Sequence, residues 1–78
     1  MDYGMKKVLI KWEDTAATVG WYSKEAVISR KCVFCESVGY LVHKDRDKVI
    51  LSGMMADGEF NSIQYIPRGC IKEIKDID

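Results

Sequence analysis

The chain has 78 residues, of which 47% are hydrophobic and 31% charged, and its twelve basic and twelve acidic side chains cancel. A chain of this length buries only about 60% of its unfolded surface, so we expect one small domain over residues 1–78 and no interdomain cleft. No apolar run approaches the roughly 20 residues of a membrane helix, and the first residues lack the apolar segment of a signal peptide. Three cysteines, an odd number, fit a reducing compartment better than a disulfide framework. These features predict a cytoplasmic domain without membrane contact.

Apolar and polar side chains alternate along most of the chain, and this period of two indicates β-strands. The first predicted strand covers residues 6–14, and a loop without a consistent period follows it over residues 15–20. Ser23 is placed to cap one or two helical turns over residues 24–28. The remaining strands are predicted over residues 33–44, 49–55, 60–66 and 70–74.

Turn residues separate these strands. The polar tetrapeptide 45–48 is typical of a type I turn, and Asp57-Gly58 is typical of a type I′ hairpin turn, which needs positive φ at both central residues. Pro67 lacks a backbone N–H and is expected to end the fourth strand, Arg68-Gly69 to form a tight turn, and residues 75–78 to fray. Five short strands bury one face only if their sheet curls. The predicted fold is therefore mainly β: a small five-stranded SH3-like or Sm-like barrel with at most one short helical turn.

Nearly the whole chain carries a resemblance in four blocks that follow one another in order. The blocks are Trp12-Glu13-Asp14, Gly20-Trp21, Val38-Gly39-Tyr40-Leu41-Val42 and Ile66-Pro67-Arg68-Gly69-Cys70-Ile71. In these blocks the chain resembles a family of small phage- and prophage-encoded proteins with no established activity. The resemblance implies an origin and a fold, and it implies no chemistry.

Residues 38–74 are in addition similar to Sm-like proteins. Gly39-x-Leu41 with Asp45 six positions after the glycine matches the first Sm signature, and Arg68-Gly69-Cys70-Ile71 resembles the second. Lys48 and Val49 stand where that family has an asparagine in its RNA pocket. The resemblance therefore implies the fold, and inherited RNA binding does not follow from it.

The cysteines and the single histidine are the candidate metal ligands. Cys32 and Cys35 have the CxxC spacing of zinc sites, and Cys70 and His43 would complete a Cys₃His set. The two residues inside the CxxC, a valine and a phenylalanine, are poor turn formers, and on a strand Cys32 and Cys35 would point to opposite faces. We therefore expect three small buried cysteines and no metal or cofactor, with a zinc-stapled adaptor as an alternative.

Few residues of the chain suggest catalysis. There is one histidine, and the sequence has no nucleophile elbow and no glycine-rich phosphate loop. A Cys–His pair would have to join His43 to Cys70 or Cys35. The carboxylate pairs at positions 45 and 47 and at 13 and 14 are interpreted as residues of turns and strand ends. The chain is predicted not to be an enzyme.

Aromatic residues suggest where the domain binds. Trp12 shares a strand face with Val8 and Ile10 and is expected in the core. Trp21 ends the first loop, and loops at the mouth of such barrels commonly bind ligands. The predicted recognition surface consists of Trp21, Tyr22 and Arg68.

The third and fourth strands carry more apolar side chains than a core of this size can hide, so we expect the edge strands to pair copies of the chain in a dimer or ring. The predicted function is a non-enzymatic, phage-derived interaction module that is homo-oligomeric and binds a host or phage protein. An Sm-like ring that binds RNA, DNA or a small nucleotide is the first alternative. The neutral charge disfavours a long nucleic acid, because phosphate neutralisation supplies much of such affinity.

Overall fold

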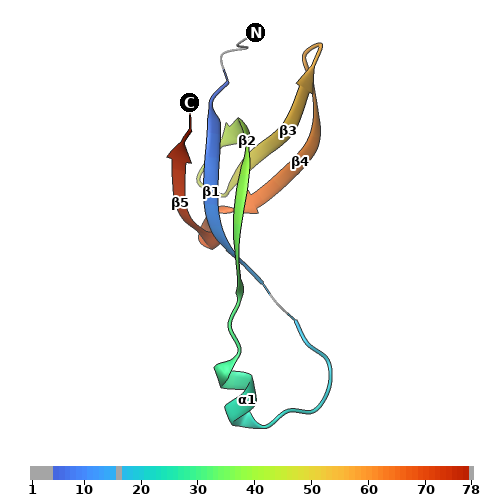
Figure 1. Ribbon diagram of the computed structural model, residues 1–78, viewed down its shortest axis with the longest axis vertical. Helices are drawn as coiled ribbons and strands as arrows, with labels where there is room; N and C mark the ends of the chain where they lie inside the picture. The colour runs from blue at the N-terminus through green and yellow to red at the C-terminus, as the bar shows by residue number, and fades with distance from the viewer. Residues whose placement is uncertain (1–4, 16, 78) are drawn as a thin grey trace.

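A computed structural model describes residues 5–15 and 17–77, and its strands form one antiparallel sheet (Figure 1). The strands follow the order β4-β3-β2-β1-β5 across the sheet. The elements along the chain are β1 (Lys7–Asp14), α1 (Lys24–Ser29), β2 (Val33–Lys44), β3 (Lys48–Ala56), β4 (Glu59–Pro67), the 3₁₀ turn η1 (Arg68–Cys70) and β5 (Ile71–Asp76). The predicted mainly β fold is confirmed. The sheet stays open in the described part of the chain, with β4 and β5 as its edges, so the predicted closure into a barrel is not confirmed.

The local signals in the sequence form the expected elements. The hydroxyl of Ser23 accepts a hydrogen bond from the backbone N–H of Ala26 at 3.2 Å and caps α1. Asp57 and Gly58 both have positive φ, 52° and 78°, as the hairpin turn requires. Pro67 is the last residue of β4, as predicted. The structure has one more helical turn than expected, because Arg68-Gly69-Cys70 forms η1.

The predicted fraying from residue 75 is wrong over the described residues. Lys75 and Asp76 belong to β5, where they lie opposite Leu9 and Val8 of β1. The ladder is then extended by the N–H of Ile77, which donates to the carbonyl oxygen of Lys7 at 3.0 Å. Residues 75–77, two of which are charged, are ordered because β1 supplies hydrogen-bond partners for their backbone. The composition of this segment does not predict such pairing.

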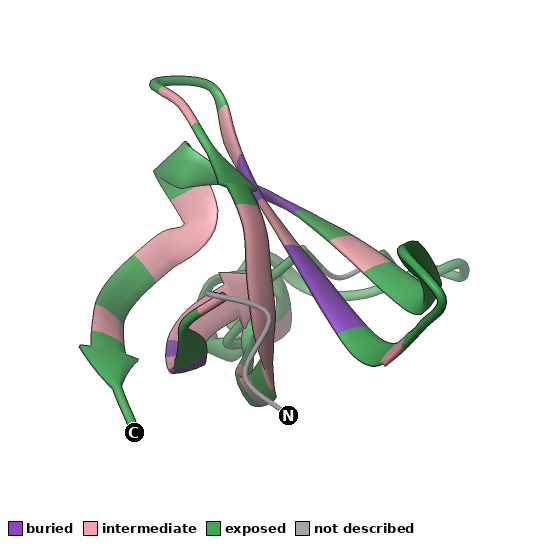
Figure 2. Cartoon of the chain, turned by 90° about the horizontal axis from the view of Figure 1, so that it is seen from above, coloured by how far each residue is buried: buried purple, intermediate pink, exposed green. Residues whose placement is uncertain are grey.

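The core is small, and its fully buried residues, purple in Figure 2, come from β1, β3 and β4. Its fully buried apolar side chains are Val8, Ile10, Val49, Leu51 and Ile66, with Trp12, Leu41, Ile71 and Ile74 packed against them and half-buried. Trp12 thus contacts the core as expected while its polar edge stays at the rim, where Nε1–H donates to Ser37 Oγ at 2.9 Å.

Strand β2 connects the two halves of the sheet. Its first part pairs with β1 as far as Tyr40, and from Tyr40 onward it pairs with β3. Gly39 lies at this changeover, where an added Cβ would sit 2.8 Å from the carbonyl oxygen of Ser52. The absence of a side chain at Gly39 therefore lets β3 approach closely and lets the sheet bend.

Candidate interaction surfaces

An arm projects from one end of the sheet. We define the arm as residues 15–32, of which the structure describes all but residue 16. Its base is held by the β1–β2 ladder, which ends with Asp14 opposite Val33. Every described arm residue is exposed except Ala26, which is half-buried. The described part of the arm therefore has no buried core of its own, and the arm makes the molecule long (Figure 1).

The dimensions of the molecule agree with this description. Its principal extents are 54 × 21 × 20 Å and its radius of gyration is 16.1 Å. A compact chain of this length has a radius of gyration of about 11.5 Å. The excess shows that the arm is held away from the sheet and is not folded back onto it.

Large apolar side chains of the arm lie in solvent. Trp21 and Val19 are fully exposed, at 101% and 96%, and Ile28 and Val27 of α1 are also exposed. Gly20 precedes Trp21 with φ of 134°, a conformation that side-chain-bearing residues rarely adopt. This turn places the predicted recognition residue Trp21 at full exposure.

Tyr22, the second predicted recognition residue, has a different environment. Its ring lies under the guanidinium of Arg30, which is 4.6 Å from the ring centroid. Its hydroxyl donates to the carbonyl oxygen of Val19 at 3.4 Å, so the ring ties the loop to the end of α1. Tyr22 is 44% exposed, so it both supports the loop that carries Trp21 and keeps part of its ring accessible to a partner.

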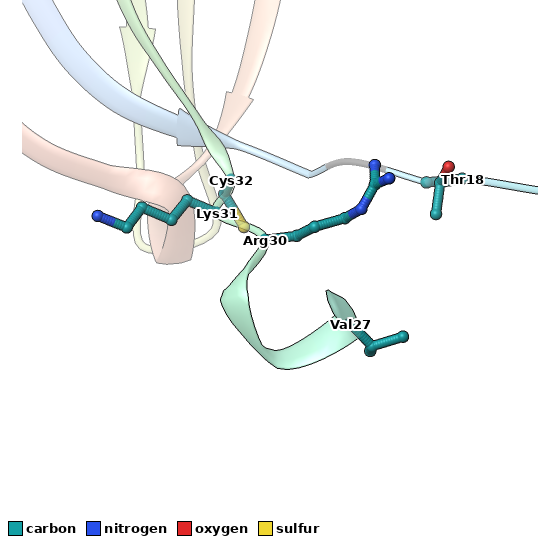
Figure 3. A pocket seen from close by; sticks show the side chains of 6 residues that line it. Thr18, Val27, Arg30, Lys31 and Cys32 are labelled. Atoms are coloured by element: carbon teal, nitrogen blue, oxygen red, sulfur yellow. The ribbon is translucent and has the colours of Figure 1, made fainter. Parts of the chain in front are cut away.

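A hollow of about 380 Å³ lies between the loop and α1 (Figure 3). The side chain of Arg30 extends across it toward Thr18, whereas Lys31 points to the opposite side. The hollow combines one apolar wall with a cationic group and is lined by Ala17, Thr18, Val27, Arg30, Lys31 and Cys32. Such a lining suits an acidic or amphipathic protein segment.

A second apolar surface lies at the tip of the β3–β4 hairpin, residues 54–61, which we call the hairpin tip. A hollow of about 220 Å³ is lined there by Met5, Met55, Gly58, Glu59 and Phe60. Met54 is 59% exposed and Phe60 is 37% exposed. The buried hydroxyl of Ser52 lies 2.7 Å from the carbonyl oxygen of Met54 and 2.8 Å from that of Asn61, and so it braces the base of the tip.

Arg68, the third predicted recognition residue, does not lie on the arm. It belongs to η1, between β4 and β5, and its N–H donates to the carbonyl oxygen of Asp47 at 3.0 Å. The loop before α1 lies at the far end of the arm from η1 (Figure 1). The structure therefore brings Trp21 and Tyr22 together and leaves Arg68 apart from them.

The candidate metal ligands are dispersed over the described residues, where no three His, Cys, Asp or Glu side chains gather in metal-binding geometry. Cys32 is exposed on the arm, and Cys35 and Cys70 are half-buried, so the prediction of three buried cysteines is wrong. Cys32 is exposed because it lies beyond the last pair of the β1–β2 ladder. His43 lies eight residues from Cys35 along β2, a contour of about 26 Å.

His43 is paired with a carboxylate in the β2–β3 turn. Its Nε2 lies 2.8 Å from Asp45 Oδ2, while Asp45 Oδ1 accepts the N–H groups of Asp47 and Lys48 at 2.7 and 2.9 Å. The bond from His43 and these two backbone bonds hold the pKa of Asp45 well below its usual range. The interpretation of Asp45 as a turn residue is confirmed.

The carboxylates at the other predicted pair also make local contacts. Glu13 pairs with Lys72 of β5 at 3.3 Å, and Asp14 accepts the backbone N–H of Thr15 at 2.8 Å. Both side chains thus join or end strands, as expected for residues at this place in the chain.

Val27 of the arm was not singled out from the sequence, whereas the apolar residues of the third and fourth strands, which include the hairpin tip, were expected to take part in self-association. Two signals identify both surfaces in retrospect. Val27 and Ile28 are adjacent apolar residues on a six-residue helix, which is shorter than most helices that are stable in water. The arm and the hairpin tip also carry opposite charge, a pattern that can be read directly from the residues.

Comparisons of the chain with protein-family models, with curated proteins and with solved structures found no match. In the described part of the chain, no helix is both long enough and apolar enough to cross a membrane.

Proposed function

We propose that the protein is a non-enzymatic protein-interaction module and that the arm is its recognition element. The observation that carries this proposal is the full exposure of Trp21 at the end of an arm whose described residues form no core. Tryptophan, tyrosine and arginine are the residue types that dominate the binding energy of protein interfaces. The arm carries one of each, Trp21, Tyr22 and Arg30, and Arg30 stacks on the ring of Tyr22.

The exposed area is of the size that an interface uses. Trp21 and Tyr22 of the arm, together with Phe34 of β2 two residues beyond the end of the arm, are exposed to 101%, 44% and 71%. With roughly 200 Å² for each aromatic side chain, they leave about 430 Å² in solvent. This is about half of the ~800 Å² that one partner buries in an interface of standard size, before Val19, Val27 and Ile28 are counted.

The arm is also ordered by its own contacts, which lowers the entropy lost on binding. The Ser23 cap fixes the start of α1, and the stack of Arg30 on Tyr22 closes the loop against its end. The β1–β2 ladder supports the base. A partner would therefore meet a surface that is largely formed before contact.

A nucleic-acid ligand is less well supported. Lys6, Lys11 and Lys72 pair with Asp76, Glu73 and Glu13 at 3.4, 3.7 and 3.3 Å, so these three basic side chains are neutralised on the sheet and add little to a positive stripe for phosphate groups. A protein partner needs no such stripe. A phage-derived module acting in the cytoplasm is part of this proposal, on the resemblance described above.

The test compares binding by the protein with Trp21→Ser against binding with Tyr65→Ser. Tyr65 is a matched control, because it is 64% exposed on β4 and lies outside the arm. Each protein is immobilised, and the bound proteins are identified and their affinities measured. We expect Trp21→Ser to lower the affinity for the bound partner by about 10-fold or more. Tyr65→Ser should leave this affinity within about twofold of the wild-type value. Equal affinities for both variants would refute the proposal.

A further inference from the structure

This inference rests on the proposed function and names what the arm binds. We propose that the arm of one copy of the chain holds the hairpin tip of a second copy. Four observations carry it: the charges of the two surfaces, their apolar hollows, their positions at opposite ends of the molecule, and the poor quality of the sheet edges as interfaces.

The charges of the two surfaces are opposite. The arm carries Lys24, Arg30 and Lys31 against Glu25, three positive charges and one negative, for a net charge of +2. The hairpin tip carries Asp57 and Glu59 with no basic residue, for a net charge of −2. Lys6 follows Met5, which lines the hollow of the hairpin tip, but its ammonium group pairs with Asp76 at 3.4 Å. Facing charges of opposite sign favour this pair of surfaces and fix their register.

The apolar parts also correspond. Arg30 and Val27 line the hollow of the arm, and Glu59 and Phe60 line the hollow of the hairpin tip. Contact would place the carboxylate of Glu59 beside the guanidinium of Arg30, whose stack on Tyr22 leaves its planar N–H edge available for a carboxylate. Phe60 and the exposed Met54 would then cover Val27 and the adjacent apolar surface.

The two surfaces lie at opposite ends of the 54 Å axis, with α1 at one end and the β3–β4 turn at the other (Figure 1). One copy in this conformation cannot bring its own arm to its own hairpin tip. Two antiparallel copies would make both arm–tip contacts and close a symmetric dimer, whereas a head-to-tail contact leaves one arm and one tip unused for further copies. In the head-to-tail arrangement, further copies add until a ring closes or a chain of subunits grows.

The sheet edges are less suited to self-association. In β4, Ser62 has φ of 58° in the middle of the strand, and Pro67 lacks the N–H that a pairing strand would need. Strand β5 has six residues and carries Lys72 and Lys75, which discourage pairing with another strand. The arm and the hairpin tip are therefore favoured over the edge strands that the sequence pointed to.

The experiment uses charge reversal on each surface and reads the oligomeric state by native mass spectrometry and sedimentation. Wild-type protein is expected to associate. Arg30→Glu and Glu59→Lys each place like charges in contact and are expected to raise the dissociation constant by about 10- to 100-fold. Arg46→Glu and Glu36→Lys, exposed residues of the β2–β3 turn and of β2, are the matched controls and should leave assembly unchanged.

Mixing gives the decisive result. An equimolar mixture of the Arg30→Glu and Glu59→Lys proteins offers only oppositely charged contacts between unlike copies, so assembly should return. The chain that carries both substitutions should assemble alone for the same reason. A contact between two arms would not be rescued by a change in the hairpin tip. A monomeric wild type, single variants that still assemble, or a mixture that stays dissociated would each overturn the inference.

Different experimental outcomes would refute this inference and the proposed function. If wild-type copies do not associate but another protein binds in a way that depends on Trp21, the arm is a recognition element and its partner is not a second copy. If Trp21→Ser leaves both assembly and every partner affinity unchanged, the proposed function itself is refuted.

Discussion

Replacing Gly39 by alanine should destabilise the protein by steric conflict at the bend of the sheet. The added Cβ would lie 2.8 Å from the carbonyl oxygen of Ser52 and 3.4 Å from Leu51 Cβ. Real Cβ atoms essentially never approach to less than 3.0 Å, so something must move. The obstacle is backbone, and Ser52 is held in the ladder opposite Tyr40, so movement disturbs the β2–β3 pairing.

The expected cost is about 1–3 kcal/mol, the range for overpacking of a well-packed site. A chain of this length has a total stability of roughly 4–12 kcal/mol. The melting temperature should therefore fall by about 5–20 °C. The loss would be large enough to measure and small enough to leave a folded protein to study at low temperature.

Gly69→Ala is the matched control, because a Cβ at Gly69 would meet no atom within 4 Å. Both variants are melted by far-ultraviolet circular dichroism at the same protein concentration, and the free energy of unfolding is measured in urea. We expect Gly69→Ala to stay within about 0.5 kcal/mol of wild type. If Gly39→Ala is as stable as Gly69→Ala, the close approach of β3 to β2 at Gly39 is wrong.

Three further predictions concern the hairpin, the β2–β3 turn and the arm. Ser52→Ala removes a buried hydroxyl that braces the carbonyl groups of Met54 and Asn61, and it should cost about 1–3 kcal/mol in urea unfolding; an unchanged free energy of unfolding would contradict the bracing role. Asp45 has a lowered pKa in the folded state, so its stabilising contribution is present above the unfolded carboxyl pKa of about 3.9 and is lost as the pH falls below it. Asp45→Asn should therefore lower the free energy of unfolding at neutral pH, and this free energy should fall less steeply than that of wild type as the pH is lowered. Urea unfolding between pH 2 and 7 measures both, and curves of equal slope for the two proteins would contradict this prediction. Cys32 is the exposed cysteine of the arm and should react with iodoacetamide before Cys35 and Cys70, which are half-buried; peptide mass spectrometry would reveal equal rates at all three if the arm were folded onto the sheet.

Local chemistry in the sequence was enough to predict most of the elements. Alternation of apolar and polar residues marks β1, β2, β3 and β4 because a strand exposes its two faces to different surroundings. Ser23 and Asp57-Gly58 mark the start of α1 and the β3–β4 turn because capping and positive φ depend on one or two residues. The same period also placed Val8 and Ile10 in the core, where both are fully buried.

The candidate site was predicted in part. Trp21 and Tyr22 could be singled out because they are aromatic residues next to a glycine in a loop, and the structure exposes Trp21 fully. Arg68 was predicted as the third recognition residue although it belongs to a different turn. The sequence does not tell how far η1 lies from the arm. The opposite charges of the arm and the hairpin tip were present in the residues and gained meaning only when the two surfaces were seen at opposite ends of the molecule.

The sequence by itself determined where strands, turns and the short helix lie, because those choices follow from backbone preferences and from the period of nearby side chains. The tertiary structure alone decided whether the sheet closes, how long β5 is and whether the arm rests on the core. Each of these depends on partners far away in the chain: β5 is extended by the backbone of β1, and the sheet bends where Gly39 admits Ser52. The apolar residues Val27, Ile28 and Phe34 are exposed because no distant segment of the described chain packs against them.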